Sequence, residues 1–289
     1  MTHLGAGKRS KRRVLIGILT VLFCVYLAWV FLVFLAQDML VFPRFMVQSG
    51  GRQTAPAGVE EWTIDTEDGA VHAWFIRGGG CSDGSPCGTV VMMHGNGMLI
   101  DDWMDMAGWF TAMGWNVLLP EFRGYGRAAG KPSEQALRDD AVAFIDLLNE
   151  RSDADPGAIV YYGRSLGGAL AAQVARDREP AGMILQTPPA SIAAMAWRYG
   201  APPFLVRNRF DTVAALRDGP RVETLLIEHD KDRIIPASHL ASLREAASHA
   251  KPLLLQGGHD VLANASQEQL FLEEVEAFLD SIKNDSQGQ

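Results

Sequence analysis

The sequence lacks several features that would point to other kinds of protein. It has no internal repeat and no low-complexity tract, and only three of its 289 residues are cysteine. Cys81 and Cys87 have no histidine nearby that could complete a tetrahedral metal site. The formal net charge is −8, and without the five basic residues between positions 8 and 13 it is −13. We therefore expect no metal, no organic cofactor and no nucleic-acid partner.

One stretch lacks charge altogether. The 23 residues from Val14 to Ala36 contain no acidic or basic side chain and are almost all apolar. As an α-helix they would be about 35 Å long, enough to cross a hydrocarbon core of about 30 Å. The sequence therefore predicts a transmembrane anchor at residues 14–36, through which the protein is held at a membrane.

The residues around this run indicate its orientation. A basic tail at residues 1–13 precedes it and Asp38 follows it, and basic residues are retained on the cytoplasmic side. We expect a single-pass protein of a bacterial inner membrane, with the N-terminus cytoplasmic and the rest facing the periplasm. A cleaved signal peptide is the alternative, but Phe34-Leu35-Ala36 places a large residue where cleavage needs a small one. A buried helix of a soluble protein would not explain the basic flank.

After a juxtamembrane segment at residues 37–58, strand-like and helix-like patterns alternate. Asp68-Gly69 is a tight-turn dipeptide between two strand-like runs, which predicts a leading antiparallel hairpin. The remaining alternation is typical of a mostly parallel sheet with helices on both faces. About eight strands are expected in one domain, residues 59–289. The predicted strands are 61–66, 71–77, 89–94, 116–119, 159–162, 183–186, 224–228 and 252–255, and the predicted helices are 100–113, 133–149, 166–176, 237–247 and 266–282.

The alternation is interrupted at residues 188–218. This segment has four prolines and no clean period, which predicts a short cap insertion over a site. Its large apolar side chains either pack onto the domain or line an apolar groove for an acyl chain. They are Met195, Trp197, Tyr199, Phe204, Leu205 and Phe210.

The most specific motif is Gly163-Arg164-Ser165-Leu166-Gly167. It follows the predicted strand 159–162 and precedes a predicted helix, which is the setting that a G-x-S-x-G nucleophile turn requires. A strand that turns abruptly into a helix holds its corner residue in a strained conformation and projects the side chain above the sheet. Ser165 is therefore the candidate nucleophile.

A serine hydroxyl needs a base, and in this arrangement the chain order is serine, acid, histidine. His229, His239, His249 and His259 follow Ser165, and His239 and His249 are expected to be solvated on a helix. His259 lies in a loop after the last predicted strand, at the sheet edge where Ser165 is expected. It is the candidate general base.

Two acidic residues compete for the third position. Asp230 and Asp232 both follow the predicted strand 224–228, and Asp232 is followed by a rigid stretch that ends at Pro236. We choose Asp232 as the residue that orients the histidine, and expect Asp230 to form bonds within the turn.

Stabilising a developing oxyanion takes two backbone N–H groups. The residue after the nucleophile, Leu166, supplies one. The loop His94-Gly95-Asn96-Gly97 supplies the other, assigned to Asn96 with Gly97 as the alternative. His94 itself is expected to bond loop backbone.

Cys81 and Cys87 flank a turn-rich segment, whereas Cys24 lies in the predicted anchor. Outside the cytoplasm the flanking pair can oxidise and pin the loop as a disulfide. Two unpaired thiols are the alternative.

Taken together, these motifs resemble the bud-emergence family of membrane-anchored α/β hydrolases. The resemblance covers nearly the whole chain and rests on His94-Gly95-Asn96, Arg123-Gly124-Tyr125-Gly126, Gly130-Lys131-Pro132-Ser133-Glu134, the Ser165 motif, Asp232 to Pro236 and Gly258-His259. It implies the α/β-hydrolase fold, a catalytic triad of Ser165, Asp232 and His259, and general hydrolase activity, with relatives assigned to esters, thioesters and lipids.

The expected function is hydrolysis of a carboxylic ester or thioester through an acyl-enzyme on Ser165, with a small-molecule or lipid ester as substrate. A serine peptidase or amidase is the first alternative, because the same triad cleaves amides. A non-catalytic membrane-anchored binding protein is the second. It is disfavoured because all three triad positions and both oxyanion segments are intact.

The charge bias around residues 14–36 generates a topology prediction. Protease added to spheroplasts is expected to digest the domain at 59–289 and to leave the basic tail protected, because that tail is retained inside. Immunoblotting with tags at the two ends measures this. Protection of the domain would show the reverse orientation.

Overall fold

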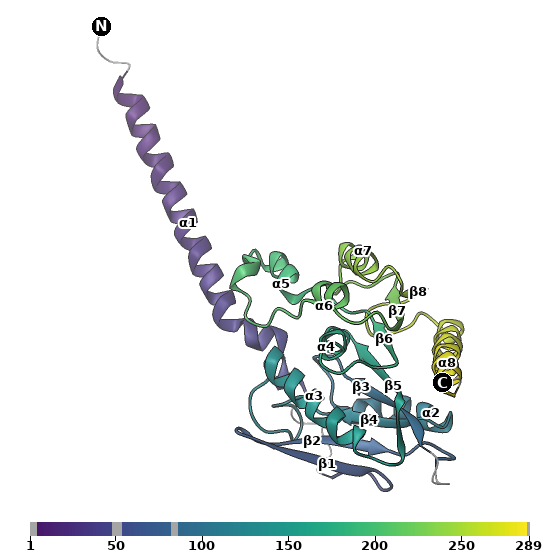
Figure 1. Cartoon of the computed structure of the whole chain (residues 1–289). Helices are drawn as coiled ribbons and strands as arrows, with labels where there is room; N and C mark the ends of the chain where they lie inside the picture. The colour runs from purple at the N-terminus through teal and green to yellow at the C-terminus, as the bar shows by residue number, and fades with distance from the viewer. Residues whose placement is uncertain (1–4, 48–53, 82–85, 288–289) are drawn as a thin grey trace.

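The computed structural model describes residues 5–47, 54–81 and 86–287. One long helix, α1 (Gly5–Val41), projects from an α/β domain that contains the rest of the described chain (Figure 1). Residues 48–53 of the predicted juxtamembrane segment and residues 82–85 of the cysteine loop lie outside the described residues.

The described residues form one 8-stranded sheet in the order β1-β2-β4-β3-β5-β6-β7-β8. Strand β2 pairs antiparallel with β1 and β4, and all other neighbours pair parallel. The predicted α/β-hydrolase fold, including its leading hairpin, is therefore confirmed. The strands are β1 (Glu60–Thr66), β2 (Gly69–Ile76), β3 (Cys87–Met93), β4 (Asn116–Pro120), β5 (Ala154–Arg164), β6 (Gly182–Gln186), β7 (Glu223–His229) and β8 (Lys251–Leu255).

Helices cover both faces of this sheet. One buried apolar cluster includes residues of α3, α4, α6 and α7, and a second includes residues of α2 and α8. The remaining helices of the domain are short, and one of them, η2, contributes Ile100 and Trp103 to the second cluster. Besides α1, the helices are η1 (Arg44–Met46), η2 (Ile100–Trp103), α2 (Met104–Ala112), α3 (Glu134–Asn149), α4 (Leu166–Val174), α5 (Ile192–Met195), η3 (Ala196–Tyr199), η4 (Pro203–Leu205), α6 (Thr212–Asp218), α7 (Ala237–Ala246) and α8 (Ala265–Gln287).

The burial of each strand follows its position in the sheet. Every residue of the central strands β4 and β6 is buried, whereas residues of the edge strand β1 alternate between half-buried and exposed. Central parallel strands are covered on both faces and therefore consist of continuous apolar runs. Because β3, β5, β6, β7 and β8 run parallel, their carboxyl ends lie at the same end of the sheet.

Helix α1 is longer than the predicted anchor at both ends. It starts within the basic tail and continues through Gln37–Val41, which were assigned to the juxtamembrane segment. Between Lys11 and Val41 it is long and apolar enough to cross a membrane, and only 6% of its most apolar stretch is buried. The helix is therefore not a core helix of the domain.

The predicted cap is shorter in the structure than the 188–218 segment. Its last part forms α6, which is capped by Asp211 accepting from Ala214 N and which packs on α4 and α7. Ala215 and Leu216 of α6 are buried in the core. Only the part before Asp211, with α5, η3 and η4, lies outside the layer of covering helices (Figure 1).

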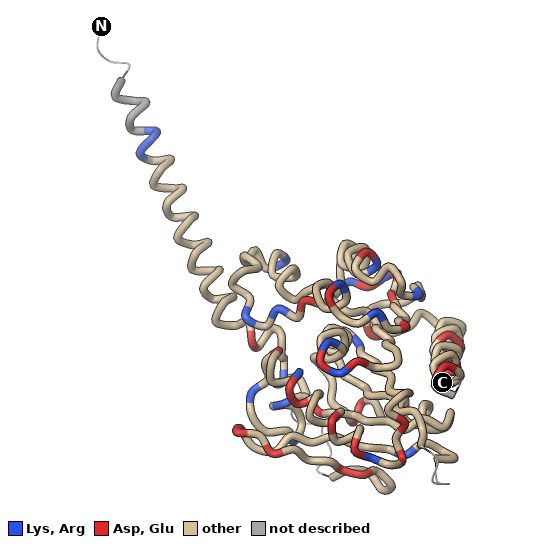
Figure 2. Tube along the Cα trace, viewed as in Figure 1, with Lys and Arg blue, Asp and Glu red and all other residues tan. Residues whose placement is uncertain are grey.

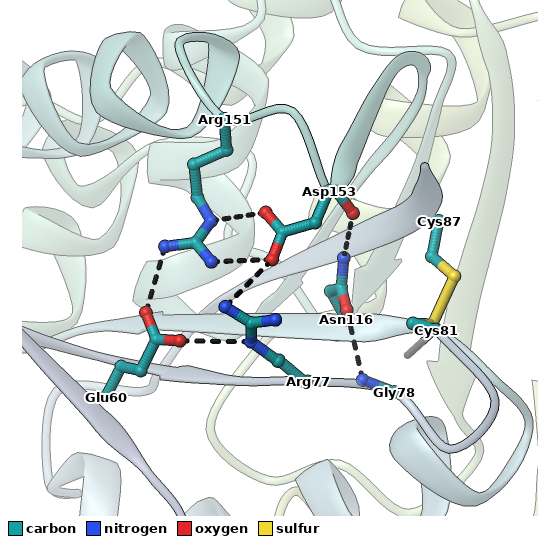
Figure 3. A network of polar contacts seen from close by, with 8 residues as sticks. All are labelled: Glu60, Arg77, Gly78, Cys81, Cys87, Asn116, Arg151 and Asp153. Carbon is teal, nitrogen blue, oxygen red and sulfur yellow. Dashed lines mark hydrogen bonds and ion pairs between the residues drawn. A yellow bond between two sulfur atoms is a disulfide. The ribbon is translucent and has the colours of Figure 1, made fainter. Parts of the chain in front are cut away.

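Cys81 and Cys87 form a disulfide at the amino end of β3, beside a buried asparagine (Figure 3). Asn116 Oδ1 accepts from Gly78 N at 3.0 Å, and its Nδ2 donates to Asp153 O at 3.1 Å. The disulfide and the asparagine thus join the chain that leads into β3 to the start of β5. These contacts lie at the amino ends of the strands, at the opposite end of the sheet from Ser165.

Ion pairs stabilise the same end of the sheet (Figure 3). Arg151 donates to both carboxylate oxygens of Asp153 and to Glu60, while Arg77 contacts both acids. The bond from Arg151 holds the pKa of Asp153 below its usual range, against the opposing effect of burial.

The disulfide is expected to contribute stability. Replacing both Cys81 and Cys87 with Ser should lower the free energy of unfolding by about 2 kcal/mol, because a short loop is no longer closed in the unfolded chain. Thermal unfolding without reductant measures the change. Cys24→Ser is the matched control, since Cys24 is an exposed free thiol on α1, and equal melting temperatures for all three proteins would contradict the prediction.

Candidate active site

Ser165 is the single residue between strand β5 and helix α4, and its backbone is strained. Its φ of 53° and ψ of −120° lie in a region that residues other than glycine rarely adopt. The neighbouring glycines are sterically required. A Cβ on Gly167 would lie 1.9 Å from Met93 O, and one on Gly163 would lie 2.3 Å from Gly167 O. The sharp turn that the motif predicts is therefore present.

The structure brings together the three residues chosen as nucleophile, base and acid. His259 Nε2 lies 2.9 Å from Ser165 Oγ, and His259 Nδ1 lies 2.7 Å from Asp232 Oδ2. The side chains of His259 and Asp232 are 9% and 4% exposed. A carboxylate only accepts, so Nδ1 carries the proton and Nε2 is free to accept one from the serine hydroxyl.

Asp232 is held as a carboxylate. Its Oδ1 accepts from Ile234 N at 2.7 Å and Ile235 N at 2.8 Å, while Oδ2 faces His259. Burial by itself raises the pKa of this carboxyl, but the bonds from His259 and the two backbone N–H groups outweigh burial and lower it. The acid therefore stays charged beside the imidazole.

Two residues outside the predicted triad support the histidine loop. His229, at the end of β7, donates from Nδ1 to Gly258 O at 2.5 Å, and Gln186 Nε2 lies 3.3 Å from its Nε2. Asp230, expected to bond within its own turn, instead accepts from Gly257 N of the neighbouring loop at 2.9 Å. The position of His229 directly before the acid loop was the available signal.

The backbone groups expected to hold an oxyanion have no internal partner. The N–H groups of Leu166 and Asn96 make no hydrogen bond within the part of the chain that the structure describes, and the same is true of Gly97. A Cβ on Gly95 would lie 3.8 Å from Ser165 Cβ, so this loop lies directly against Ser165. These N–H groups are therefore available to a ligand beside Ser165.

The rest of this loop is held from two sides. Tyr125 Oη donates to Asn96 O at 2.9 Å, and the Asn96 side chain donates to Val41 O, the last residue of α1, at 3.1 Å. Buried His94 lies between Gly95 O and the Glu121 carboxylate, both at 2.8 Å. His94 thus contacts loop backbone, as expected of a structural residue.

The expectation for His239 was wrong. It is buried rather than solvated, and its Nδ1 accepts from Ala190 N at 3.1 Å. His249 is exposed, as expected. A helical pattern does not reveal which of its polar residues faces the chain segment that crosses above it.

Two pockets flank the site. The first, of about 190 Å³, lies between α1 and the cap and reaches Asn96 and Ile234. The second, of about 390 Å³, is lined by Met98, Arg164 and Asp260. Three of the six cap side chains named as candidate groove residues line the first pocket, namely Met195, Tyr199 and Leu205, whereas Phe210 belongs to the core.

No cluster of metal-binding side chains occurs among the described residues.

The sheet order, the strained serine turn and the hydrogen-bonded Ser–His–Asp series define the class of protein, an α/β hydrolase. The family model described as "Serine aminopeptidase, S33" (Hydrolase_4) matches residues 84–232. The chain belongs to this α/β hydrolase family. The matched range includes Ser165 and Asp232 and ends before His259.

The chain is also similar to curated proteins over most of its length. An uncharacterized protein of Mycobacterium tuberculosis is 30% identical over 226 residues, 77% of this chain and 79% of that protein. Uncharacterized protein YfhR of Escherichia coli is 28% identical over 205 residues, 69% of this chain and 72% of YfhR. Alpha/beta hydrolase domain-containing protein 17C of Xenopus tropicalis is 30% identical over 230 residues, 76% and 70% of the two chains.

Similar solved structures share the fold at low sequence identity. Esterase Pf2001 of Pyrococcus furiosus superposes with a TM-score of 0.61 at 19% identity, over 77% of this chain and 90% of the esterase. Est1E from Butyrivibrio proteoclasticus gives a TM-score of 0.59 at 15% identity, over 81% of this chain and all of that chain.

Two of the buried histidines, His229 and His239, generate a prediction about acid stability. Burial lowers the pKa of His229 and of His239. As pH falls below about 6.5, the unfolded chain takes up protons that the folded protein does not, so the free energy of unfolding should fall. Urea unfolding between pH 7 and 5 measures this slope.

His239→Gln should make that slope shallower, because one such proton difference is removed. His249→Gln is the matched control and should leave the slope unchanged, since the His249 side chain is exposed. Identical slopes in all three proteins would contradict the assignment of neutral buried histidines.

Proposed function

We propose that this protein is a serine hydrolase that cleaves carboxylic ester or thioester bonds through an acyl-enzyme on Ser165. The observation that carries the proposal is the series from Ser165 Oγ through His259 to Asp232, at 2.9 and 2.7 Å. Its members come from three loops at the carboxyl ends of β5, β7 and β8. Esterases among the similar folds are consistent with it.

In the first half of the reaction, Ser165 Oγ attacks the substrate carbonyl while its proton moves to His259 Nε2. The Asp232 carboxylate stabilises the imidazolium that forms. The carbonyl oxygen becomes negative and accepts from the N–H groups of Leu166 and Asn96, which have no competing partner in the described chain. His259 then gives the proton to the leaving alcohol or thiol as the carbonyl–oxygen or carbonyl–sulfur bond breaks.

Water completes the reaction. His259, again neutral, takes a proton from a water molecule that attacks the acyl-enzyme carbonyl. The second tetrahedral intermediate uses the same two N–H groups. Its collapse releases the carboxylic acid and returns the proton from His259 to Ser165 Oγ.

A second candidate function is aminopeptidase activity, after the description of the matched family. The second pocket favours it, because three acidic side chains that could bind an α-ammonium line it, Asp102, Asp260 and Glu268. Two of them are already engaged. Asp260 pairs with Arg164 at 2.6 Å, and Asp102 accepts from Leu99 N at 2.8 Å. Ester hydrolysis therefore remains the leading function.

The proposal includes a membrane anchor. Helix α1 has no charged side chain between Arg13 and Asp38 (Figure 2), and its apolar side chains are largely exposed. Exposed residues of this kind are stable in a lipid environment. The catalytic domain would then lie on the extracytoplasmic side.

Substitution of the proposed nucleophile and base tests the function. Ser165→Ala and His259→Ala are each expected to lower kcat for a p-nitrophenyl ester by roughly 10⁴-fold or more, because residues that act as a unit are each indispensable. His249→Ala is the matched control, since this histidine is exposed and lies outside the site. Circular dichroism verifies that each variant is folded.

Reaction with a fluorophosphonate probe separates a hydrolase from a binding protein of the same fold. Mass spectrometry should locate the adduct on Ser165 in the unaltered protein and find none in Ser165→Ala. Near-normal turnover in either folded triad variant would refute the proposal. Faster cleavage of aminoacyl anilides than of the matching esters would favour the peptidase.

A further inference from the structure

We infer that the pocket between α1 and the cap binds the acyl chain of a membrane-dissolved ester, so that the membrane helix is itself a wall of the active site. This inference rests on the proposed function and names its substrate class. Six of the residues that line the pocket come from α1. They are Val30, Val33, Phe34, Gln37, Leu40 and Val41.

The chemistry of the lining matches an alkyl chain. Among the described residues that line the pocket none is charged, so an ionic group would lose its hydration there without gaining a partner. The Gln37 amide is already engaged, because it donates to Phe34 O and Leu205 O and accepts from Arg207 N. What remains exposed to an occupant is mostly apolar surface.

The inner end of the pocket lies beside the loop that contains Asn96 and the loop that contains Asp232. Asn96, whose N–H is proposed to bind the oxyanion, lines it, and so does Ile234, whose N–H donates to Asp232. An acyl chain in this pocket therefore places its carbonyl end beside the oxyanion loop. Arg198 of the cap donates to the carbonyl groups of Arg233 and Ile234, which holds the cap on the acid loop.

The wall supplied by α1 is fixed on the cap rather than loosely apposed. Tyr26 Oη donates to Gly200 O at 3.1 Å, and Trp29 Nε1 donates to Tyr199 O at 2.7 Å. Four residues after Phe34, nearer the domain, Asp38 accepts from Arg207 at 2.9 Å and from Asn208 at 3.2 Å. Hydrogen bonds and an ion pair thus join α1 to the cap on both sides of the pocket.

The length of α1 sets the depth of this pocket in the bilayer. Contact with the cap begins at Tyr26, and only about 18 Å of helix separates Val14 from Tyr26. That is shorter than a hydrocarbon core of about 30 Å. With Val14 at the cytoplasmic boundary of that core, the cap must dip into the outer leaflet. Trp197 and Phe204 of the cap are 65% and 78% exposed, as an immersed surface requires. The outer end of the pocket at Val30 thus lies where lipid acyl chains are.

A substitution that fills the pocket with a larger side chain tests acyl binding. Val33 lines the pocket, whereas the adjacent Leu32 is exposed and does not. In full-length protein reconstituted in phosphatidylcholine vesicles, Val33→Trp is expected to lower the octanoate-to-acetate ratio of kcat/KM for p-nitrophenyl esters by about tenfold or more, because buried methylenes lose their site. Leu32→Trp should keep the wild-type ratio. An unchanged ratio in folded Val33→Trp would overturn the inference.

Entry from the membrane has its own test. A long-chain ester that stays in its vesicle is placed either in the same phosphatidylcholine vesicles as the protein or in separate ones. Hydrolysis is expected only in the shared vesicles. Equal rates in both arrangements would show that the ester arrives through water and would overturn a lateral route.

A last measurement needs no substitution. A decyl fluorophosphonate with a diazirine at the end of its alkyl chain is reacted with the reconstituted protein and illuminated. Crosslinks on Val30–Val41 or on residues 192–206 support the inference, whereas crosslinks around Met98 and Phe271, in the second pocket, overturn it while leaving Ser165 labelled. Absence of label on Ser165 would instead refute the proposed function, and this inference with it.

Discussion

The backbone of Gly167 lies so close to the end of β3 that no side chain fits between them, since a Cβ there would be 1.9 Å from Met93 O. The rest of the site depends on this contact. It seats the first turn of α4 on the loop that follows β3, which brings Ser165 against Gly95 and leaves the Leu166 N–H without a partner in the described chain. The strained φ of Ser165 is maintained because both strand and helix are buried on either side of it.

The histidine reaches Ser165 from a different direction and depends on its own supports. Its loop is tied to the end of β7 through His229 and Asp230, while the Asp232 loop is closed by bonds to its own backbone. These contacts orient the imidazole between two fixed partners. Orientation of this kind matters because proton transfer requires hydrogen-bond distance before it requires a suitable pKa.

Helix α1 is joined to the domain by more than a linker. The Asn96 side chain donates to Val41 O, so the last turn of α1 contacts the loop beside Ser165. Nearer the N-terminus of the helix, Trp29 and Tyr26 donate hydrogen bonds to carbonyl groups of the cap. In apolar surroundings such donors and acceptors would otherwise be costly. The helix and the cap therefore satisfy each other's polar groups.

The sequence by itself determined the alternation of strands and helices, the serine turn and the choice of candidate triad residues. These depend on periodicity and on steric needs of glycine that are contained within a few neighbouring positions. Helix α6 was included in the cap because its seven residues are too few to show a period beside a proline-rich segment. Burial of His239, the support from His229 and the contact between Asn96 and Val41 were decided only by the tertiary structure. Each joins residues that are distant along the chain, and no local pattern records which distant segment will lie against them.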